Sequence, residues 1–157
     1  WTIAAIIGCS VATGVGAVYR AAKVEAGSSV VVIGCGGVGL NIVQGAKLVG
    51  AGKIIAVDLL DNKLDYAKQF GATHTINGKT ENVVKRVREI TGGGADYAFD
   101  AIGSEATVLQ IVDWLPNFVV VAGVVGLVTG SIDVVVAVGM IVGGGVVSGI
   151  LARLAQA

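Results

Sequence analysis

Short apolar runs alternate along the chain with segments whose apolar residues recur at helical spacing. Four successive apolar residues predict a buried strand over 30–33, and a second run predicts a strand over 53–57 that ends at Asp58. The segment 40–49 between them has apolar residues at helical spacing, at Ile42, Val43, Ala46 and Val49. Strands that alternate with helices indicate a parallel sheet whose strands are joined by crossover helices.

The same alternation predicts the elements that follow, as far as residue 121. Further strands are expected over 74–76, 97–99 and 118–121, and further helices over 13–22, 62–70 and 107–115. Another helix is expected between Thr80 and Gly92. Asp61 and Thr80 are residue types that cap the first turn of a helix, and Gly71 and Gly92 are of the type that ends one.

The C-terminal segment fits two interpretations. Residues 134–138 are mostly Val and have strand propensity, but continued alternation would place a helix there and a final strand near 146–148. We favour the alternation. The whole chain, 1–157, is then one domain of the α/β class, with a doubly wound parallel sheet in a three-layer αβα arrangement.

Charge and composition exclude several classes of protein. Lys plus Arg equals Asp plus Glu at 11 each, which argues against a nucleic-acid-binding protein that neutralises phosphates. Hydrophobic residues make up 54% of the chain, which excludes a disordered protein. Two cysteines are too few for a disulfide framework and favour a reducing, cytoplasmic setting.

The second half of the chain is strongly apolar. Residues 134–152 contain no charged side chain, and this length approaches the roughly 20 residues that span a membrane. Their Gly and Val content, and the lack of flanking basic clusters, favour buried strands over a membrane helix. We expect this segment to form an edge strand through which two copies of the chain associate.

The start of the chain also has an apolar run, at residues 3–9. It has neither an initiator Met nor a basic leader before it. We therefore expect the chain to begin within a longer protein rather than with a signal peptide.

Residues 34–39, Gly-Cys-Gly-Gly-Val-Gly, match the pattern G-x-G-x-x-G between a predicted strand and a predicted helix. Asp58 ends the next strand, 19 residues after Gly39. This context is the dinucleotide-binding fingerprint of the Rossmann fold. Gly34 would permit the sharp turn, Gly36 the approach of a pyrophosphate, and Gly39 close packing of helix on strand. Asp58 would bind ribose hydroxyls and repel a 2′-phosphate, which favours NAD over NADP.

Over residues 8–103 the chain resembles the coenzyme domain of the zinc-dependent, medium-chain alcohol dehydrogenases. The matching stretches occur in the same order, at Gly8-Cys9, Thr13-Gly14, Lys23-Val24, Gly27-Ser28, Gly34 to Leu40, Ile54 to Asp58, Lys63, Ala67-Lys68, Phe70 to Thr73, Ile76-Asn77, Gly93 to Asp96 and Ile102-Gly103. Beyond Pro116 the match thins to residues 121–124 and a final apolar stretch.

The resemblance implies roles for individual residues. Cys9 would be one ligand of the catalytic zinc, and Thr13 would be a catalytic residue that lines the nicotinamide together with Val38. The coenzyme-binding residues implied or predicted are Gly34, Gly36, Gly37, Val38 and Gly39 in the glycine loop, Asp58 and Lys63 at the adenosine ribose, Ile102 beside the adenine, and Ala122, Gly123 and Val124 at the carboxamide.

The zinc site implied by the resemblance needs a further Cys and a His from a separate catalytic domain. His74 is the only histidine of this chain, and we interpret it as an ordinary surface or packing residue. Zinc is therefore expected only in a full-length enzyme, and this chain alone should be inactive. We expect an NAD-binding module that positions nicotinamide for hydride transfer from a small alcohol, with NAD(H) as its ligand and no nucleic-acid or membrane partner.

Two alternatives stay open, because a fold does not settle a function. One is a non-catalytic NAD-sensing or regulatory domain of the same fold. The other is a methyltransferase with the same glycine loop. The segment from Cys9 to Thr13 favours the dehydrogenase, since a sensor has no need for it.

Overall fold

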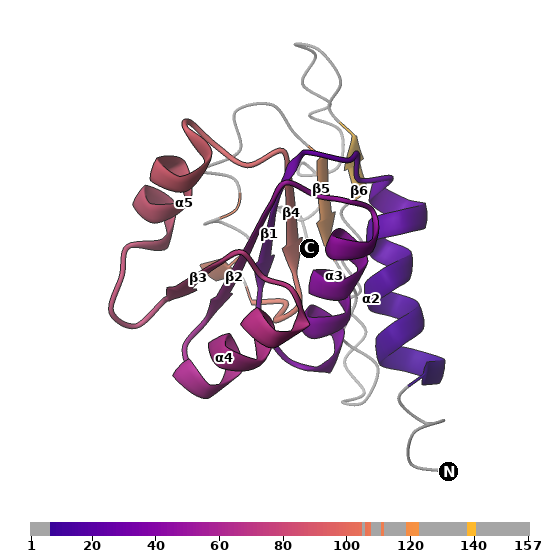
Figure 1. Cartoon of the computed structure of the whole chain (residues 1–157), viewed down its shortest axis with the longest axis horizontal. Coiled ribbons are helices and arrows are strands. Elements are labelled where there is room, and N and C mark those ends of the chain that lie inside the picture. Colours follow the sequence, from indigo (N-terminus) through magenta and orange to yellow (C-terminus); the bar gives the residue numbers. More distant parts are fainter. Residues whose placement is uncertain (1–6, 105, 108–110, 112–118, 123–137, 141–157) are drawn as a thin grey trace, which may run out of the picture.

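A computed structural model describes residues 7–104, 106–107, 111, 119–122 and 138–140 of the chain. These residues form a six-stranded sheet with the strand order β3-β2-β1-β4-β5-β6 (Figure 1). The strands are β1 (Ser29–Ile33), β2 (Lys53–Asp58), β3 (His74–Asn77), β4 (Tyr97–Asp100), β5 (Val119–Ala122) and β6 (Val138–Met140). The first five run parallel, and β6 is antiparallel to β5.

The central strands are apolar throughout because both of their faces are covered. Every residue of β1 is buried, and so are the four residues 54–57 of β2. In the register of the sheet, Val31 lies between Ile55 of β2 and Ala98 of β4. A strand that is buried on both sides cannot alternate apolar and polar residues, which explains the uninterrupted apolar runs of the sequence.

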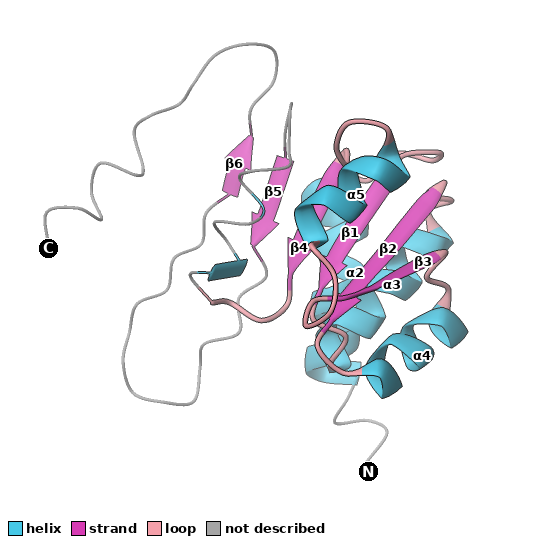
Figure 2. Ribbon diagram, turned by 90° about the vertical axis from the view of Figure 1, so that its left-hand side faces the viewer, coloured by secondary structure: helices cyan, strands magenta, loops and turns pink. Residues whose placement is uncertain are grey.

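Helices cover both faces of the sheet. The N-terminal helical segment comprises η1 (Ile7–Val11), α2 (Ala12–Gly16) and η2 (Ala17–Ala22), of which the first and last are π-helical. It packs on one face together with α3 (Gly37–Leu48) and α4 (Asp61–Phe70), through a core that includes Val18, Ile42 and Leu64. α5 (Val83–Thr91) covers the other face of the sheet (Figure 2). Val83 and Val87 of this helix belong to a buried cluster on that face, together with Ile111. The three-layer αβα prediction is confirmed.

Two helix starts differ from the prediction. The cap of α5 is Asn82, whose side chain accepts a hydrogen bond from the Lys85 N–H at 3.0 Å, whereas Thr80 lies in the preceding turn. Asp61 is the first residue of α4, and Leu60 before it provides no side-chain cap. Gly71 and Gly92 end the two helices as expected, with φ of 123° and 80°.

The favoured alternation is wrong at Val138, which lies in the antiparallel strand β6 rather than in a helix. Its β-branched side chain favours extended structure, and an antiparallel edge strand on an otherwise parallel sheet is common. The other residues of the two predicted elements, 134–137 and 146–148, lie outside the described part of the chain, as do Gly123 and Val124. Within the described ranges, none of the helices is long and apolar enough to cross a membrane.

Candidate functional site

The glycine loop, residues 34–39, leaves the carboxyl end of β1 and enters α3. The strand order reverses at β1, because β2 and β3 lie on one side of it, whereas β4 and β5 lie on the other side. In open α/β sheets, ligands bind in the crevice at such a switch point, outside the carboxyl ends of the strands. The residues that follow β1, β2, β4 and β5 are therefore the ones that can form a site.

Two glycines of the loop are required by close packing. A Cβ at Gly39 would lie 1.7 Å from the carbonyl oxygen of Gly34, so no other residue fits there without displacing the loop. Gly34 has a φ of 90°, and a Cβ on it would lie 2.7 Å from Cγ1 of Ile102. Gly34 and Gly39 thus let the turn, the helix and the loop after β4 approach one another.

Gly36 differs from these two glycines because a Cβ on it would meet nothing within 4 Å. It is exposed and precedes the first residue of α3. The N–H groups of the first helical turn point out of a helix and attract anions. The open side of Gly36 is therefore where a phosphate can come closest to the backbone.

Asp58 ends β2 and its carboxylate is held by two backbone N–H groups. Oδ2 accepts a hydrogen bond from Cys35 in the glycine loop at 2.8 Å, and Oδ1 accepts one from Leu60 at 3.0 Å. The side chain is half-buried, so the carboxylate is oriented but still reaches solvent. Sequence reasoning assigned Asp58 to ribose binding and missed this bond to the loop, which depends on the approach of two strands and leaves no signature in the spacing.

Cys35 lies beneath the loop rather than in the crevice. Its side chain is fully buried, and Sγ lies 3.7 Å from the carbonyl oxygen of Val57. The pKa of the thiol is raised to about 12, mainly by burial and in addition by the charge of Asp58, while the charge of Lys63 acts in the opposite direction. Lys63 lies in the first turn of α4, and its charge, like that of Asp58, affects the pKa of Cys35 in the glycine loop, so both side chains lie near this residue.

The loop after β4 forms the opposite side of the crevice. Ile102 is 47% exposed and lies against Gly34. Ala122 ends β5 beside Asp100, the last residue of β4, and so reaches the same edge of the sheet. The candidate residues that the structure gathers at this edge are the glycine loop, Asp58, Lys63, Ile102 and Ala122.

The N-terminal helical segment meets the start of α3 at Gly14. A Cβ on this glycine would lie 2.6 Å from Cβ of Asn41 and 2.7 Å from the carbonyl oxygen of Val38. Thr13, which is half-buried, therefore belongs to a helical turn that packs tightly on the turn holding Val38. Both residues were expected at the nicotinamide, and the helix crossing brings their two turns together.

The zinc ligand implied by the resemblance, Cys9, is an exposed free thiol in η1. Among the residues whose positions are described, no three His, Cys, Asp or Glu side chains gather as a metal site. His74 begins β3 at the amino-terminal edge of the sheet, where Nδ1 lies 2.9 Å from Oγ1 of Thr73. The described residues therefore do not fit a zinc ion by themselves.

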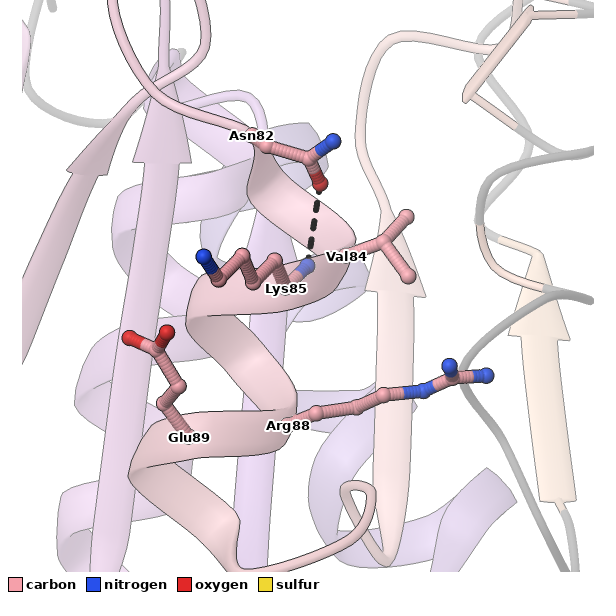
Figure 3. A pocket seen from close by; sticks show the side chains of 5 residues that line it. All are labelled: Asn82, Val84, Lys85, Arg88 and Glu89. Atoms are coloured by element: carbon pink, nitrogen blue, oxygen red, sulfur yellow. Dashed lines mark hydrogen bonds between the residues drawn. The ribbon is translucent and has the colours of Figure 1, made fainter.

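The surface also has hollows away from this edge. One is formed by α5 and lined by Asn82, Val84, Lys85, Arg88 and Glu89 (Figure 3). Its residues include none of the glycine loop or of the candidates around it. Beside it, Arg86 of the same helix forms ion pairs with Glu81 at 3.1 Å and with Glu89 at 2.8 Å. We interpret this hollow as a charged, solvated helix surface.

Comparisons with known proteins agree with this geometry. A family model described as zinc-binding dehydrogenase matches residues 37–153. The probable S-(hydroxymethyl)glutathione dehydrogenase 1 of Schizosaccharomyces pombe is 52% identical over 106 residues, which cover 67% of this chain and 28% of that protein. The S-(hydroxymethyl)glutathione dehydrogenase of Paracoccus denitrificans is 52% identical over 105 residues, or 62% of this chain and 28% of that protein.

Among solved structures, benzyl alcohol dehydrogenase from Acinetobacter calcoaceticus superposes with a TM-score of 0.71 at 43% identity, over 82% of this chain and 36% of that one. The chain thus spans about 28% of the length of the curated relatives it matches. The region matched by the family model contains the glycine loop from Gly37 onward, Asp58 and the strands from β2 to β6. By its family model, its relatives and its fold, this chain belongs to the zinc-dependent alcohol dehydrogenases, as part of their NAD-binding-region domain.

Proposed function

We propose that this chain binds NAD(H) and, within a full-length enzyme, positions the nicotinamide for hydride transfer from a small alcohol. The observation that carries the proposal is the carboxylate of Asp58, which the Cys35 N–H orients at 2.8 Å beside the open face of Gly36. An anion-attracting helix start and an oriented carboxylate lie together at the switch point of the sheet. A dinucleotide requires both, because its pyrophosphate is anionic and its ribose donates hydrogen bonds.

The adenosine half of the coenzyme would lie between Asp58 and the loop after β4. Each oxygen of Asp58 accepts one backbone hydrogen bond and keeps capacity for a ribose hydroxyl. Lys63 would supply a cation near the same ribose, and Ile102 an apolar wall for the adenine. A 2′-phosphate at this position would face the charge of Asp58, so we propose NAD rather than NADP as the coenzyme.

The nicotinamide half would extend to the other side of the glycine loop. There Val38 and the turn that holds Thr13 are packed together, and β5 ends at Ala122. Gly123 and Val124 follow it and lie outside the described residues. Because the described residues do not form a zinc site, we propose zinc only for the full-length enzyme, with Cys9 as the single ligand from this chain.

The association of two copies through the C-terminal edge is a further part of this proposal. β6 is the last strand of the described sheet, and an edge strand offers unpaired N–H and C=O groups to a second copy. A reducing, cytoplasmic setting suits such a dimer with free thiols. Light scattering without detergent should give a discrete dimer mass, and charge introduced at Val146 or Val147 should shift it toward the monomer.

The test of coenzyme binding is a titration of the chain with NADH, followed by fluorescence or calorimetry. We expect saturable binding that Asp58→Ala weakens roughly 10- to 150-fold, because a hydrogen bond to a charged group contributes on the order of 1.5–3 kcal/mol. No saturable binding by the unaltered chain, or equal binding by the Asp58→Ala variant, would contradict the proposal. Added zinc should produce no alcohol oxidation by this chain alone, since one ligand cannot hold the ion.

A further inference from the structure

The loop that follows β4 is hydrogen-bonded to a buried carboxylate. Asp100 ends this strand, and only 2% of its surface is exposed. Oδ1 accepts hydrogen bonds from the backbone N–H groups of Ile102 at 2.8 Å and Gly103 at 3.2 Å. Oδ2 accepts one from the hydroxyl of Thr107 at 2.6 Å. A carboxylate this deeply buried requires such donors, and the three bonds fix the turn that they come from.

The turn that Asp100 fixes is also the part of the chain that lies against the glycine loop. Cγ1 of Ile102 lies so close to Gly34 that a Cβ there would be 2.7 Å away. The neighbouring residue, Ala101, donates its N–H to the carbonyl oxygen of Ile33 at 2.8 Å, and its Cβ would lie 3.6 Å from a Cβ on Gly39. Asp100 therefore sets the distance between the two walls of the crevice at the switch point.

We infer that Asp100 is a positioning residue for the coenzyme, which sets the affinity for its adenosine half by holding Ile102 against the glycine loop. It acts through Ile102 and does not touch the ligand, because its carboxylate is buried and is bound by groups of the loop itself. The inference rests on the proposed NAD-binding function. A substitution of Asp100 should therefore weaken the binding of ligands that contain the adenosine half, even where the fold is retained.

The opposite end of the same strand offers a matched control. Asp96 lies just before β4, and its Oδ2 accepts hydrogen bonds from the N–H and the hydroxyl of Ser29, both at 2.7 Å. This carboxylate ties β4 to β1 at the amino-terminal edge of the sheet, away from the crevice. Removal of the Asp96 carboxylate should destabilise the sheet without moving Ile102. An Asp96 variant therefore distinguishes a general loss of stability from a loss of the position of Ile102.

The experiment measures binding of ADP-ribose and of NADH by calorimetry, and stability by urea unfolding, for the full chain and its variants. Asp100→Ala should bind both ligands about 10-fold more weakly, since the turn that carries Ile102 loses all three bonds. Asp100→Asn keeps an oxygen for the two backbone N–H groups and should recover most of the affinity. Asp96→Ala should lose stability but bind ADP-ribose as the unaltered chain does.

Two results would overturn the inference while leaving the proposed function intact. One is a folded Asp100→Ala variant that binds ADP-ribose like the unaltered chain. The other is an Asp96→Ala variant that loses as much affinity as Asp100→Ala. If Asp100→Ala does not fold, Thr107→Val decides, because it removes the donor to Oδ2, together with the contacts of this hydroxyl to Ser104, and leaves both bonds to Oδ1 in place. Unchanged ADP-ribose affinity of Thr107→Val also overturns the inference. An unaltered chain that binds neither ligand refutes the proposed function, and this inference with it.

Discussion

The carboxylate of Asp58 accepts a hydrogen bond of 2.8 Å from the backbone N–H of Cys35, which ties the end of β2 to the glycine loop after β1. The bond links the group proposed to bind the ribose to the loop proposed to bind the pyrophosphate. Leu60 holds the other carboxylate oxygen at 3.0 Å. Asp58 is therefore a candidate ligand-binding group and also stabilises the glycine loop, and substitutions can distinguish these two roles.

Asp58→Asn keeps the size of the side chain but offers one acceptor oxygen to two backbone N–H donors. One donor then loses its partner, so we expect the free energy of unfolding in urea to fall by about 1–3 kcal/mol. NADH affinity should fall as well. The ratio of NADH affinity to NADPH affinity should decrease, because the negative charge that repels a 2′-phosphate is gone. Calorimetry with both coenzymes gives the ratio.

The control for Asp58→Asn is Asp65→Asn. Asp65 pairs with Lys68 at 3.2 Å on the exposed side of α4, where such pairs contribute roughly 0–1 kcal/mol. Its substitution should leave the NADH to NADPH preference unchanged. A preference that stays the same in Asp58→Asn, or that changes equally in Asp65→Asn, would count against the assigned role of Asp58.

Replacement by Ala should lower stability at Gly39 and NADH affinity at Gly36. The Cβ of Gly39→Ala would meet the carbonyl oxygen of Gly34, so overpacking should lower the free energy of unfolding by about 1–3 kcal/mol or more. Gly36→Ala places its Cβ in open space and should unfold like the unaltered chain, yet weaken NADH binding because the methyl group occupies the approach of the pyrophosphate. Urea unfolding and NADH titration of both variants provide the test. Normal NADH affinity of Gly36→Ala would show that no phosphate approaches this glycine.

Local patterns in the sequence predicted the elements around the site well. The apolar run at 30–33, the glycines after it and Asp58 at the end of the next strand each reflect neighbouring residues, and the structure has β1, α3 and β2 there. The helix cap at Asn82 was missed because Thr80 and Asn82 are both residue types that cap helices, and the backbone path determines which of them does so.

Contacts between distant segments could not be predicted in this way. The bond between Cys35 and Asp58 and the contact of Ile102 with Gly34 join residues 23 and 68 positions apart, and neither has a local pattern. The antiparallel direction of β6 was missed for a related reason. Strand propensity at Val138 indicates extended structure but contains no information about the direction of pairing.

The two cysteines should differ in their reaction with an alkylating reagent. The thiolate is the reactive species, and Cys35 is buried with a pKa raised to about 12, whereas Cys9 is exposed. At pH 8 we expect one rapidly labelled thiol in the native chain and two in urea, counted by mass spectrometry. A Cys9→Ser variant should show no rapid labelling until it is unfolded. Rapid labelling of Cys35 in the native chain would mean that the glycine loop opens readily.

The raised pKa of Cys35 also predicts how stability depends on pH. Folding holds the proton on this thiol, whose pKa rises from 9.0 to about 12, so its contribution is complete below pH 9 and is lost as the pH rises toward 12. Between these values the unfolded chain releases the proton and the native chain retains it, which favours unfolding. Cys35→Ala removes this dependence, although its smaller side chain lowers stability at every pH. In urea unfolding at pH 8 and pH 10.5, the difference between the unaltered chain and Cys35→Ala should therefore shrink at the higher pH. A constant difference would show that the thiol titrates alike in both states.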